Sequence, residues 1–296
     1  MNPENASAVP LPRYMGQRNS GTGFGLPHRH FRVTDSTNSR ARELAVAGAP
    51  HGTVVTADEQ TEGRGRQGRP WSAPAGKALL YSAILRPLGD RPLLSLAAGL
   101  AVCEAAEELA GDLAGAGTEP TGPADLAGAA TRAPGVECRV KWPNDVLLGS
   151  RKLAGILIEA RPRDDWAVIG VGLNLTISVD EFPSELKATA TSLFGSEMGN
   201  RGESRRSLPA VAPPGLPPVP FTAAVVLDRQ LERWINADST EILGSWSERD
   251  ALRGREVSWE GGSGVADGVG DRGGLVVVSG GGRVVLDSGE VHLTVT

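Results

Sequence analysis

The chain has 296 residues, 39 glycines, 21 prolines and a formal net charge of −5. Hydrophobic residues make up 40% of it, which is enough for a packed core, and at roughly 150 residues per domain the length predicts about two domains. The negative net charge excludes a global positive field for holding DNA or RNA.

The two cysteines, Cys103 and Cys138, lie in different segments without C-x-x-C spacing, so a disulfide framework or a zinc site is not expected. Both are expected to be buried as small apolar residues. The first 27 residues show no basic-then-apolar signal peptide, and no uncharged apolar run reaches the roughly 18 residues of a membrane span. A cytoplasmic protein without membrane contact is therefore predicted.

Residues 1–27 are predicted to be a flexible tail, too short for a DNA-binding helix-turn-helix, so DNA binding is not expected. Helix and strand patterns then alternate along the chain. Helices are predicted over residues 36–48 (with Asp35 or Ser36 as N-cap), 93–110 and 221–243. Strands are predicted over 53–57, 78–85, 137–148 (interrupted by Pro143), 153–160 and 166–175, the last two paired.

Two segments lack periodicity and are predicted to be disordered insertions, 111–135 and 196–220. From residue 254 on, short β-branched runs alternate with glycine-rich turns, a pattern typical of a small all-β module of about five strands. The predicted organisation is a tail (1–27), a main domain (28–251) and a C-terminal β domain (252–296).

Residues 63–69 read GRGRQGR and contain the G-x-G-x-x-G spacing. A dinucleotide fingerprint needs a strand directly before it and a helix directly after it. Polar residues 58–62 and the prolines that follow argue against that context. Three arginines on a flexible backbone can instead close over an anion, with guanidinium groups facing phosphate oxygens; the alternative is a solvated surface loop.

Lysine is rare in this chain, and two of the four lysines, Lys141 and Lys152, lie within one twelve-residue stretch that contains a Trp-Pro turn. A lysine at the start of an apolar strand is costly to bury unless it meets an anion. Lys152 is therefore the strongest single candidate for function, although its head group could also lie in water at the strand end.

Several motifs together resemble the biotin–protein ligases. They are DSTNS at 35–39, EQTEGRGRQGRPW at 59–71, KWPNDVLL at 141–148, RKLAGILIE at 151–159, GVGLNL at 170–175 and ATSL at 190–193. They occur in that family's order, and the resemblance covers roughly residues 30–250 plus a small C-terminal β module. The chain is most similar to monofunctional members that lack the N-terminal DNA-binding domain.

The resemblance implies an α+β fold: a class II aminoacyl-tRNA synthetase-like mixed sheet with flanking helices, plus a small C-terminal SH3-like β-barrel. It also implies an enzyme that joins biotin and ATP, with Mg²⁺, to give biotinyl-5′-AMP and pyrophosphate. A lysine of a biotin carboxyl carrier domain, of an acyl-CoA or pyruvate carboxylase, then attacks the mixed anhydride. A monomer or weak homodimer is expected, and no metal site made by protein ligands alone.

The resemblance also implies roles for thirteen residues. Lys152, Arg64 and Asp145 would be catalytic, with Asp145 a general base or orienter for the incoming amine. Biotin would contact Ser36, Thr37, Asn38, Gln60, Arg64, Gly65, Arg66 and Lys152. ATP or the adenylate would contact Arg64, Arg66, Arg69, Trp71, Asn144, Asn174 and Lys152.

Structural alternatives stay open for three of these features. The Ser36–Asn38 motif is also a helix N-cap pattern, Trp71 could be a core aromatic residue, and Asp145 could form a turn after Pro143. Three other functions also remain: a lipoate or octanoate ligase, an RNA-binding protein that uses the arginine loop, and an inactive biotin-binding module. The negative net charge argues against the second, and Lys152 argues against the third.

Overall fold

The computed structural model describes residues 23–115, 136–195 and 219–293. Its main unit is a seven-stranded mixed sheet with the order β1-β2-β3-β7-β6-β5-β4. Only β1 and β2 pair in parallel; the other neighbours are antiparallel. The strands are β1 (His28–Thr34), β2 (Val54–Gln60), β3 (Ala78–Leu85), β4 (Cys138–Lys141), β5 (Asp145–Leu148), β6 (Arg151–Arg161) and β7 (Trp166–Asn174).

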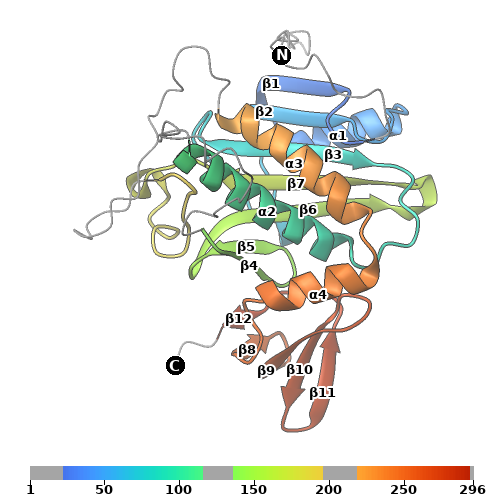
Figure 1. The fold of residues 1–296 in the computed structure, drawn as a ribbon, viewed down its shortest axis with the longest axis vertical. Helices are drawn as coiled ribbons and strands as arrows, with labels where there is room; N and C mark the ends of the chain where they lie inside the picture. Colours follow the sequence, from blue (N-terminus) through green and yellow to red (C-terminus); the bar gives the residue numbers. More distant parts are fainter. Residues whose placement is uncertain (1–22, 116–135, 196–218, 294–296) are drawn as a thin grey trace, which may run out of the picture.

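Helices cover both faces of this sheet. Helices α2 (Leu94–Gly115) and α3 (Val219–Ile235) lie side by side across one face, where the largest hydrophobic core forms (Figure 1). Helix α1 (Thr37–Val46) packs on β2, β3 and β7 through a second, smaller core around Ala41, Ala45 and Trp166. Cys103 and Cys138 are buried as predicted, and burial raises the pKa of the Cys138 thiol to about 12.

Helix α4 (Ser239–Arg249) connects the main unit to a second sheet (Figure 1). Arg249 makes two hydrogen bonds to Glu107 of α2, at 2.6 and 3.0 Å, so the end of α4 is held on the main core. The second sheet is antiparallel, with the order β11-β10-β9-β8-β12, and its five strands match the number expected. They are β8 (Glu256–Trp259), β9 (Gly262–Val269), β10 (Leu275–Ser279), β11 (Gly282–Leu286) and β12 (His292–Leu293). These pairings establish a sheet, and closure into an SH3-like barrel stays a prediction.

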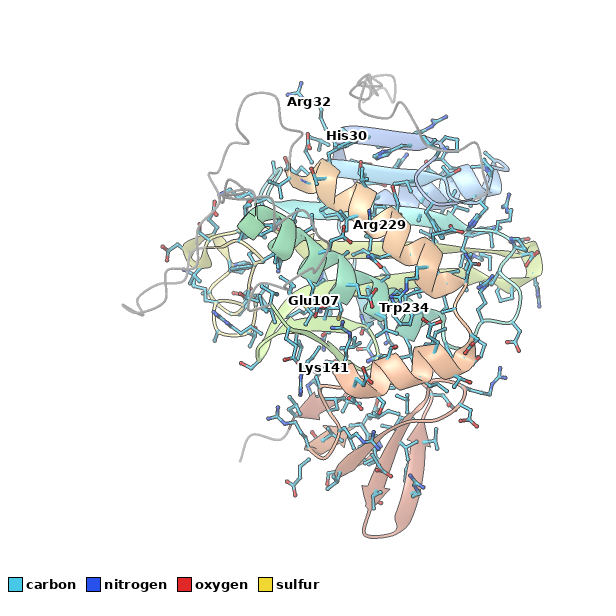
Figure 2. All side chains as sticks on the ribbon, in the orientation of Figure 1. His30, Arg32, Glu107, Lys141, Arg229 and Trp234 are labelled. Atoms are coloured by element: carbon cyan, nitrogen blue, oxygen red, sulfur yellow. The ribbon has the colours of Figure 1, made fainter. Side chains whose placement is uncertain are left out.

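Basic side chains lie on both edge strands of this sheet. His30 and Arg32 project from β1 at one edge, whereas Lys141 lies on β4 at the other (Figure 2). Strand β1 was not predicted, because its polar side chains hide any apolar alternation. Among the described residues, no helix is long and apolar enough to cross a membrane.

Several predicted boundaries were wrong. The helix expected over 221–243 is two helices, because Asp238 begins α4 by accepting a hydrogen bond from the Glu241 amide. The strand expected over 137–148 is interrupted at Pro143 as predicted, but its two parts are the antiparallel strands of a hairpin, β4 and β5.

Three further boundaries differ because tertiary contacts extend the ordered structure. Strand β2 runs on to Gln60, three residues past its predicted end, through pairing with β1. Helix α2 continues to Gly115, five residues into the expected 111–135 insertion. Residues 23–27 of the expected tail belong to the fold, with Phe24 buried against His51. The remaining residues of the tail and of both insertions, apart from 219–220 in α3, lie outside the described residues.

Candidate active site

All thirteen residues singled out from the sequence line one cavity of about 480 Å³. Its walls come from strands β3, β6 and β7, the start of α1, the loop after β2 and residues 186–190. On β7, residues 170, 172 and 174 share the cavity face because side chains alternate along a strand. The fold thus gathers segments that lie more than a hundred residues apart.

Lys152 and Asp145 form the charged centre of this cavity. The Lys152 Nζ lies 2.7 Å from Asp145 Oδ1, on the neighbouring strand β5, and the Lys152 side chain is 38% exposed. Its backbone is also fixed, because its N–H donates to the Thr189 carbonyl (2.7 Å) and its carbonyl accepts from the Thr191 N–H (2.9 Å). Lys152 is therefore ion-paired but open to the cavity, where a ligand anion can reach it.

Trp71 packs against strands β6 and β7 at two glycines, Gly155 and Gly172, which have no side chains. A Cβ added at Gly172 would come within 2.3 Å of Trp71 Cε2, and one at Gly155 within 3.1 Å of Cζ3. The Lys152 Nζ lies 5.8 Å from the ring centroid. Trp71 is thus a wall of the cavity next to the charged centre, and the glycines of the GVGLN and KLAGIL motifs make room for it.

The glycine–arginine loop is closed by its own backbone. The Gly65 N–H donates to the Arg69 carbonyl (2.7 Å) and the Trp71 N–H to the Gly63 carbonyl (2.8 Å). Arg64 donates to Ser39 Oγ at 3.0 Å, and Arg69 pairs with Glu290 of the C-terminal unit. The loop therefore holds three cations at the mouth of the cavity, two of them tethered by side chains outside the loop.

The start of α1 and the end of β2 meet at one wall of the cavity. Gln60 Oε1 accepts from the Thr37 amide (2.7 Å) and hydroxyl (3.0 Å). Ser36 is in the N-cap position, but its hydroxyl makes no capping hydrogen bond. The N-cap alternative is therefore right about the position of Ser36 and wrong about its hydrogen bond, and that hydroxyl is available to a ligand.

The carboxylate next to this motif has a separate, structural role. Asp35 accepts two hydrogen bonds from Arg40, at 3.0 and 2.7 Å, and one from the Ser36 amide. The Arg40 guanidinium lowers the pKa of Asp35 to about 2, so Asp35 is ionised at the helix N-terminus, where a negative charge is favourable.

Asn144 and Asn174 use their amide groups within the protein. The Asn144 Nδ2 donates to the Ile156 carbonyl (2.9 Å), and the Asn174 Nδ2 donates to the Thr191 carbonyl (3.0 Å). Both side chains line the cavity, and both hold a neighbouring backbone segment in place.

Among the residues at or behind this cavity that sequence reasoning missed, four contact the predicted ones or come from the C-terminal unit. Glu290 and Leu293 of the C-terminal unit line it, and Ser82 and Glu159 hydrogen-bond to residues of the Ser36–Asn38 motif. Ser82 stands at the centre of an apolar strand, and a fully buried hydroxyl there was a signal that could have been noticed. Nothing in the sequence placed Glu290 near the loop.

Comparisons with known proteins agree with this geometry. Residues 30–175 match the model of the biotin/lipoate A/B protein ligase family. The chain is 34% identical over 287 residues to the biotin–[acetyl-CoA-carboxylase] ligase of Mycobacterium tuberculosis, covering 92% of each chain. It is 38% identical over 167 residues to the bifunctional ligase/repressor BirA of Bacillus subtilis, a match that spans 54% of this chain and 44% of that protein.

The fold is also similar to solved structures. The biotin protein ligase of Aquifex aeolicus in complex with biotin and ATP superposes with a TM-score of 0.64, at 27% identity, covering 91% of this chain and 99% of the other. A biotin protein ligase from Leishmania major shares the fold, with a TM-score of 0.54 at 22% identity. The long match to the mycobacterial ligase, together with the gathered motifs, shows that the chain belongs to the biotin–protein ligase family.

Proposed function

We propose that this chain joins biotin to ATP, releasing pyrophosphate, and transfers biotin from biotinyl-5′-AMP to a lysine of a biotin carboxyl carrier domain. The observation that carries the proposal is the single cavity that holds Lys152, Asp145, the arginine loop and the Thr37–Gln60 pair together.

In the first step, a biotin carboxylate oxygen attacks the α-phosphorus of ATP, and the bond to the pyrophosphate oxygen breaks. This brings two anions together, so the site must supply positive charge. Lys152 lies at the cavity centre, and we assign it to the carboxylate and the α-phosphate. Arg64, Gly65, Arg66 and Arg69 are assigned to the phosphates, and Trp71, Asn144 and Asn174 to the nucleotide end.

In the second step, the amine of the carrier lysine attacks the biotinyl carbonyl, and AMP leaves with the anhydride oxygen. The amine must lose a proton, and Asp145 is the carboxylate paired with Lys152 in the cavity. Asp145 accepts that proton or orients the amine, while Lys152 neutralises the departing phosphate oxygen. The carrier belongs to an acyl-CoA or pyruvate carboxylase.

Mg²⁺ is expected to accompany ATP. The two carboxylates that line the cavity, Asp145 and Glu290, are ion-paired with Lys152 and Arg69, so neither is assigned as a metal ligand. Bound to the triphosphate, the ion would neutralise phosphate charge.

The test is exchange of labelled pyrophosphate into ATP, with biotin, lipoate and octanoate compared in parallel. Exchange with biotin alone is expected and would establish the acyl-adenylate step. Exchange with lipoate or octanoate instead would contradict the substrate assignment. A folded protein that binds biotin without exchange would contradict the reaction itself.

A further inference from the structure

A chain of hydrogen bonds runs behind the polar end of the cavity and ends on a carboxylate. Asn38 is 5% exposed, and its Nδ2 donates to Glu159 Oε2 (2.9 Å) and to the Leu157 carbonyl (3.3 Å). Its Oδ1 lies 2.6 Å from the hydroxyl oxygen of Ser82, which is fully buried. Both N–H groups and the carbonyl of Asn38 are therefore occupied by protein.

The two ends of this chain fix its direction. A carboxylate and a peptide carbonyl can only accept, so the amide nitrogen of Asn38 must face Glu159 and Leu157. The side-chain carbonyl of Asn38 then faces Ser82, so the Ser82 hydroxyl must donate its only proton to that carbonyl oxygen. Towards Thr37 Oγ1, 2.8 Å away, Ser82 can consequently only accept.

The same reasoning assigns the atoms that face the ligand. The Thr37 amide N–H can only donate, so Gln60 turns Oε1 towards it and has two Nε2–H donors left. The Thr37 hydroxyl donates its proton to Ser82 Oγ or to Gln60 Oε1. In either case its oxygen keeps lone pairs that can accept a hydrogen bond from the ligand. A cyclic urea, which offers N–H donors beside a carbonyl acceptor, complements this pattern.

We propose that Glu159 is a positioning residue for ligand selection: through Asn38 it commits the Ser82 proton, so Ser82 cannot donate to Thr37, and the lone pairs of the Thr37 hydroxyl stay available to the ligand. Asn38, assigned from the sequence as a biotin contact, acts as a link in this chain. The Asn38 side chain is closely packed, because a Cβ added at Gly170 would come within 2.1 Å of Asn38 Oδ1. The inference rests on the proposed function, since it presupposes that the urea of biotin enters this part of the cavity.

Glu159 also lies near two arginines, 3.5 Å from Arg42 and 3.7 Å from Arg64. The test must therefore separate hydrogen-bond acceptance from charge. Glu159→Gln retains an acceptor for Asn38 without the charge, whereas Glu159→Ala removes both. Arg42→Ala removes one ion pair and leaves the chain intact, which makes it the matched control.

The measurement is the dissociation constant of biotin and of 2-iminobiotin by calorimetry. In 2-iminobiotin a guanidine replaces the urea, and at neutral pH its cationic N–H donors stand where biotin has an acceptor oxygen, so Arg42→Ala also controls for the effect of charge. The wild type and Arg42→Ala are expected to prefer biotin equally. Glu159→Ala and Ser82→Ala are expected to lose about tenfold of that preference, as for one hydrogen bond, while Glu159→Gln retains most of it. Thermal unfolding of each variant separates loss of selectivity from loss of folding.

Equal selectivity in the wild type, Glu159→Ala and Ser82→Ala would overturn the inference alone. Equal losses in Glu159→Gln and Glu159→Ala would assign the effect to the ion pairs and would also overturn it. A wild-type chain that bound neither compound would overturn the proposed function as well.

Discussion

At the scale of single residues, the Lys152–Asp145 pair is expected to contribute more to the proposed reaction than to stability. Both side chains are partly exposed, at 38% and 22%, and ion pairs of that kind typically stabilise a fold by about 0–1 kcal/mol. Apart from Asp145, the Lys152 ammonium contacts the Trp71 ring, 5.8 Å from its centroid, and the Lys152 backbone is hydrogen-bonded to residues 189 and 191. Replacing the lysine should therefore change the reaction far more than the fold.

Lys152→Ala is expected to lower biotin-dependent pyrophosphate exchange by at least about 10²–10³-fold, the effect of removing one charge-stabilising donor. Biotin binding should persist, since the Thr37–Gln60 end of the cavity is untouched. Lys77→Ala is the control: Lys77 pairs with Glu181 and does not line the cavity. Near-normal exchange in Lys152→Ala would contradict the assigned role.

Gly172 is a second residue-scale test, because its missing side chain seats Trp71. Gly172→Ala places a Cβ where the indole now lies, so the ring must move. The KM for ATP is expected to rise at least about tenfold, comparable to the ~1–3 kcal/mol of a lost base-stacking contact. Gly244→Ala is the control, since its Cβ meets nothing within 4 Å and alanine favours a helix. An unchanged KM in Gly172→Ala would exclude Trp71 from nucleotide binding.

At the scale of elements, sequence patterns predicted the strands and helices whose order follows from their own residues. They missed those whose order depends on contacts with other parts of the chain. The strand over 78–85 was predicted to the residue, because a fully buried strand is continuously apolar. The polar edge strand β1 was missed, since its order comes from pairing with β2. The thirteen site residues came from motif resemblance, and their convergence on one cavity followed only from the fold. Ser82 and Glu290 lie outside the motifs, and Glu159 ends one without an assigned role, so the sequence did not identify their partners.

The N-terminus of α1 gives a pH-dependent prediction. The pKa of Asp35 is lowered to about 2 in the folded chain, so its contribution to stability is complete above the unfolded value near 4. That contribution is lost as the pH falls through the window from about 4 to 2. Arg40→Ala should therefore destabilise the protein near neutral pH and progressively less towards pH 3, as measured by urea unfolding. A destabilisation independent of pH would mean that Arg40 acts through packing alone.

The glycine–arginine loop gives a prediction about ligand-dependent protection. The guanidinium groups of its three arginines repel one another, and this repulsion opposes the backbone hydrogen bonds that close the loop. The loop should therefore open more often without ligand than with a bound phosphate. Trypsin cleavage after Arg64 and Arg66 is expected to slow severalfold with biotin and ATP together. Cleavage after the exposed Arg163, on the turn between β6 and β7, serves as the internal control. Equal cleavage of the loop in both conditions would contradict closure.

At the scale of the whole molecule, the C-terminal sheet is docked on the main unit beside the cavity. The Trp142 Nε1 donates to the Gly273 carbonyl (2.9 Å), and a Cβ at Gly273 would lie 3.3 Å from Leu93, at the start of α2. Composition alone separated this unit from the rest of the chain. Its contribution to the cavity, through Glu290 and Leu293, requires the docked arrangement. The second unit therefore completes the mouth of the active site and holds the loop through Arg69.

Glu290→Gln tests this coupling between units. The Arg69–Glu290 pair is exposed on the arginine side, so its loss should change the free energy of unfolding by less than about 1 kcal/mol. The loop, however, loses its tether to the second sheet, and the KM for ATP is expected to rise severalfold while the affinity for biotin stays constant. Asp267→Asn is the matched control, because it removes the exposed ion pair with Arg283 within the same sheet and away from the cavity. Identical kinetics in the two variants would contradict coupling through this ion pair. A parallel loss of biotin affinity in Glu290→Gln would show that its effect is not confined to the loop.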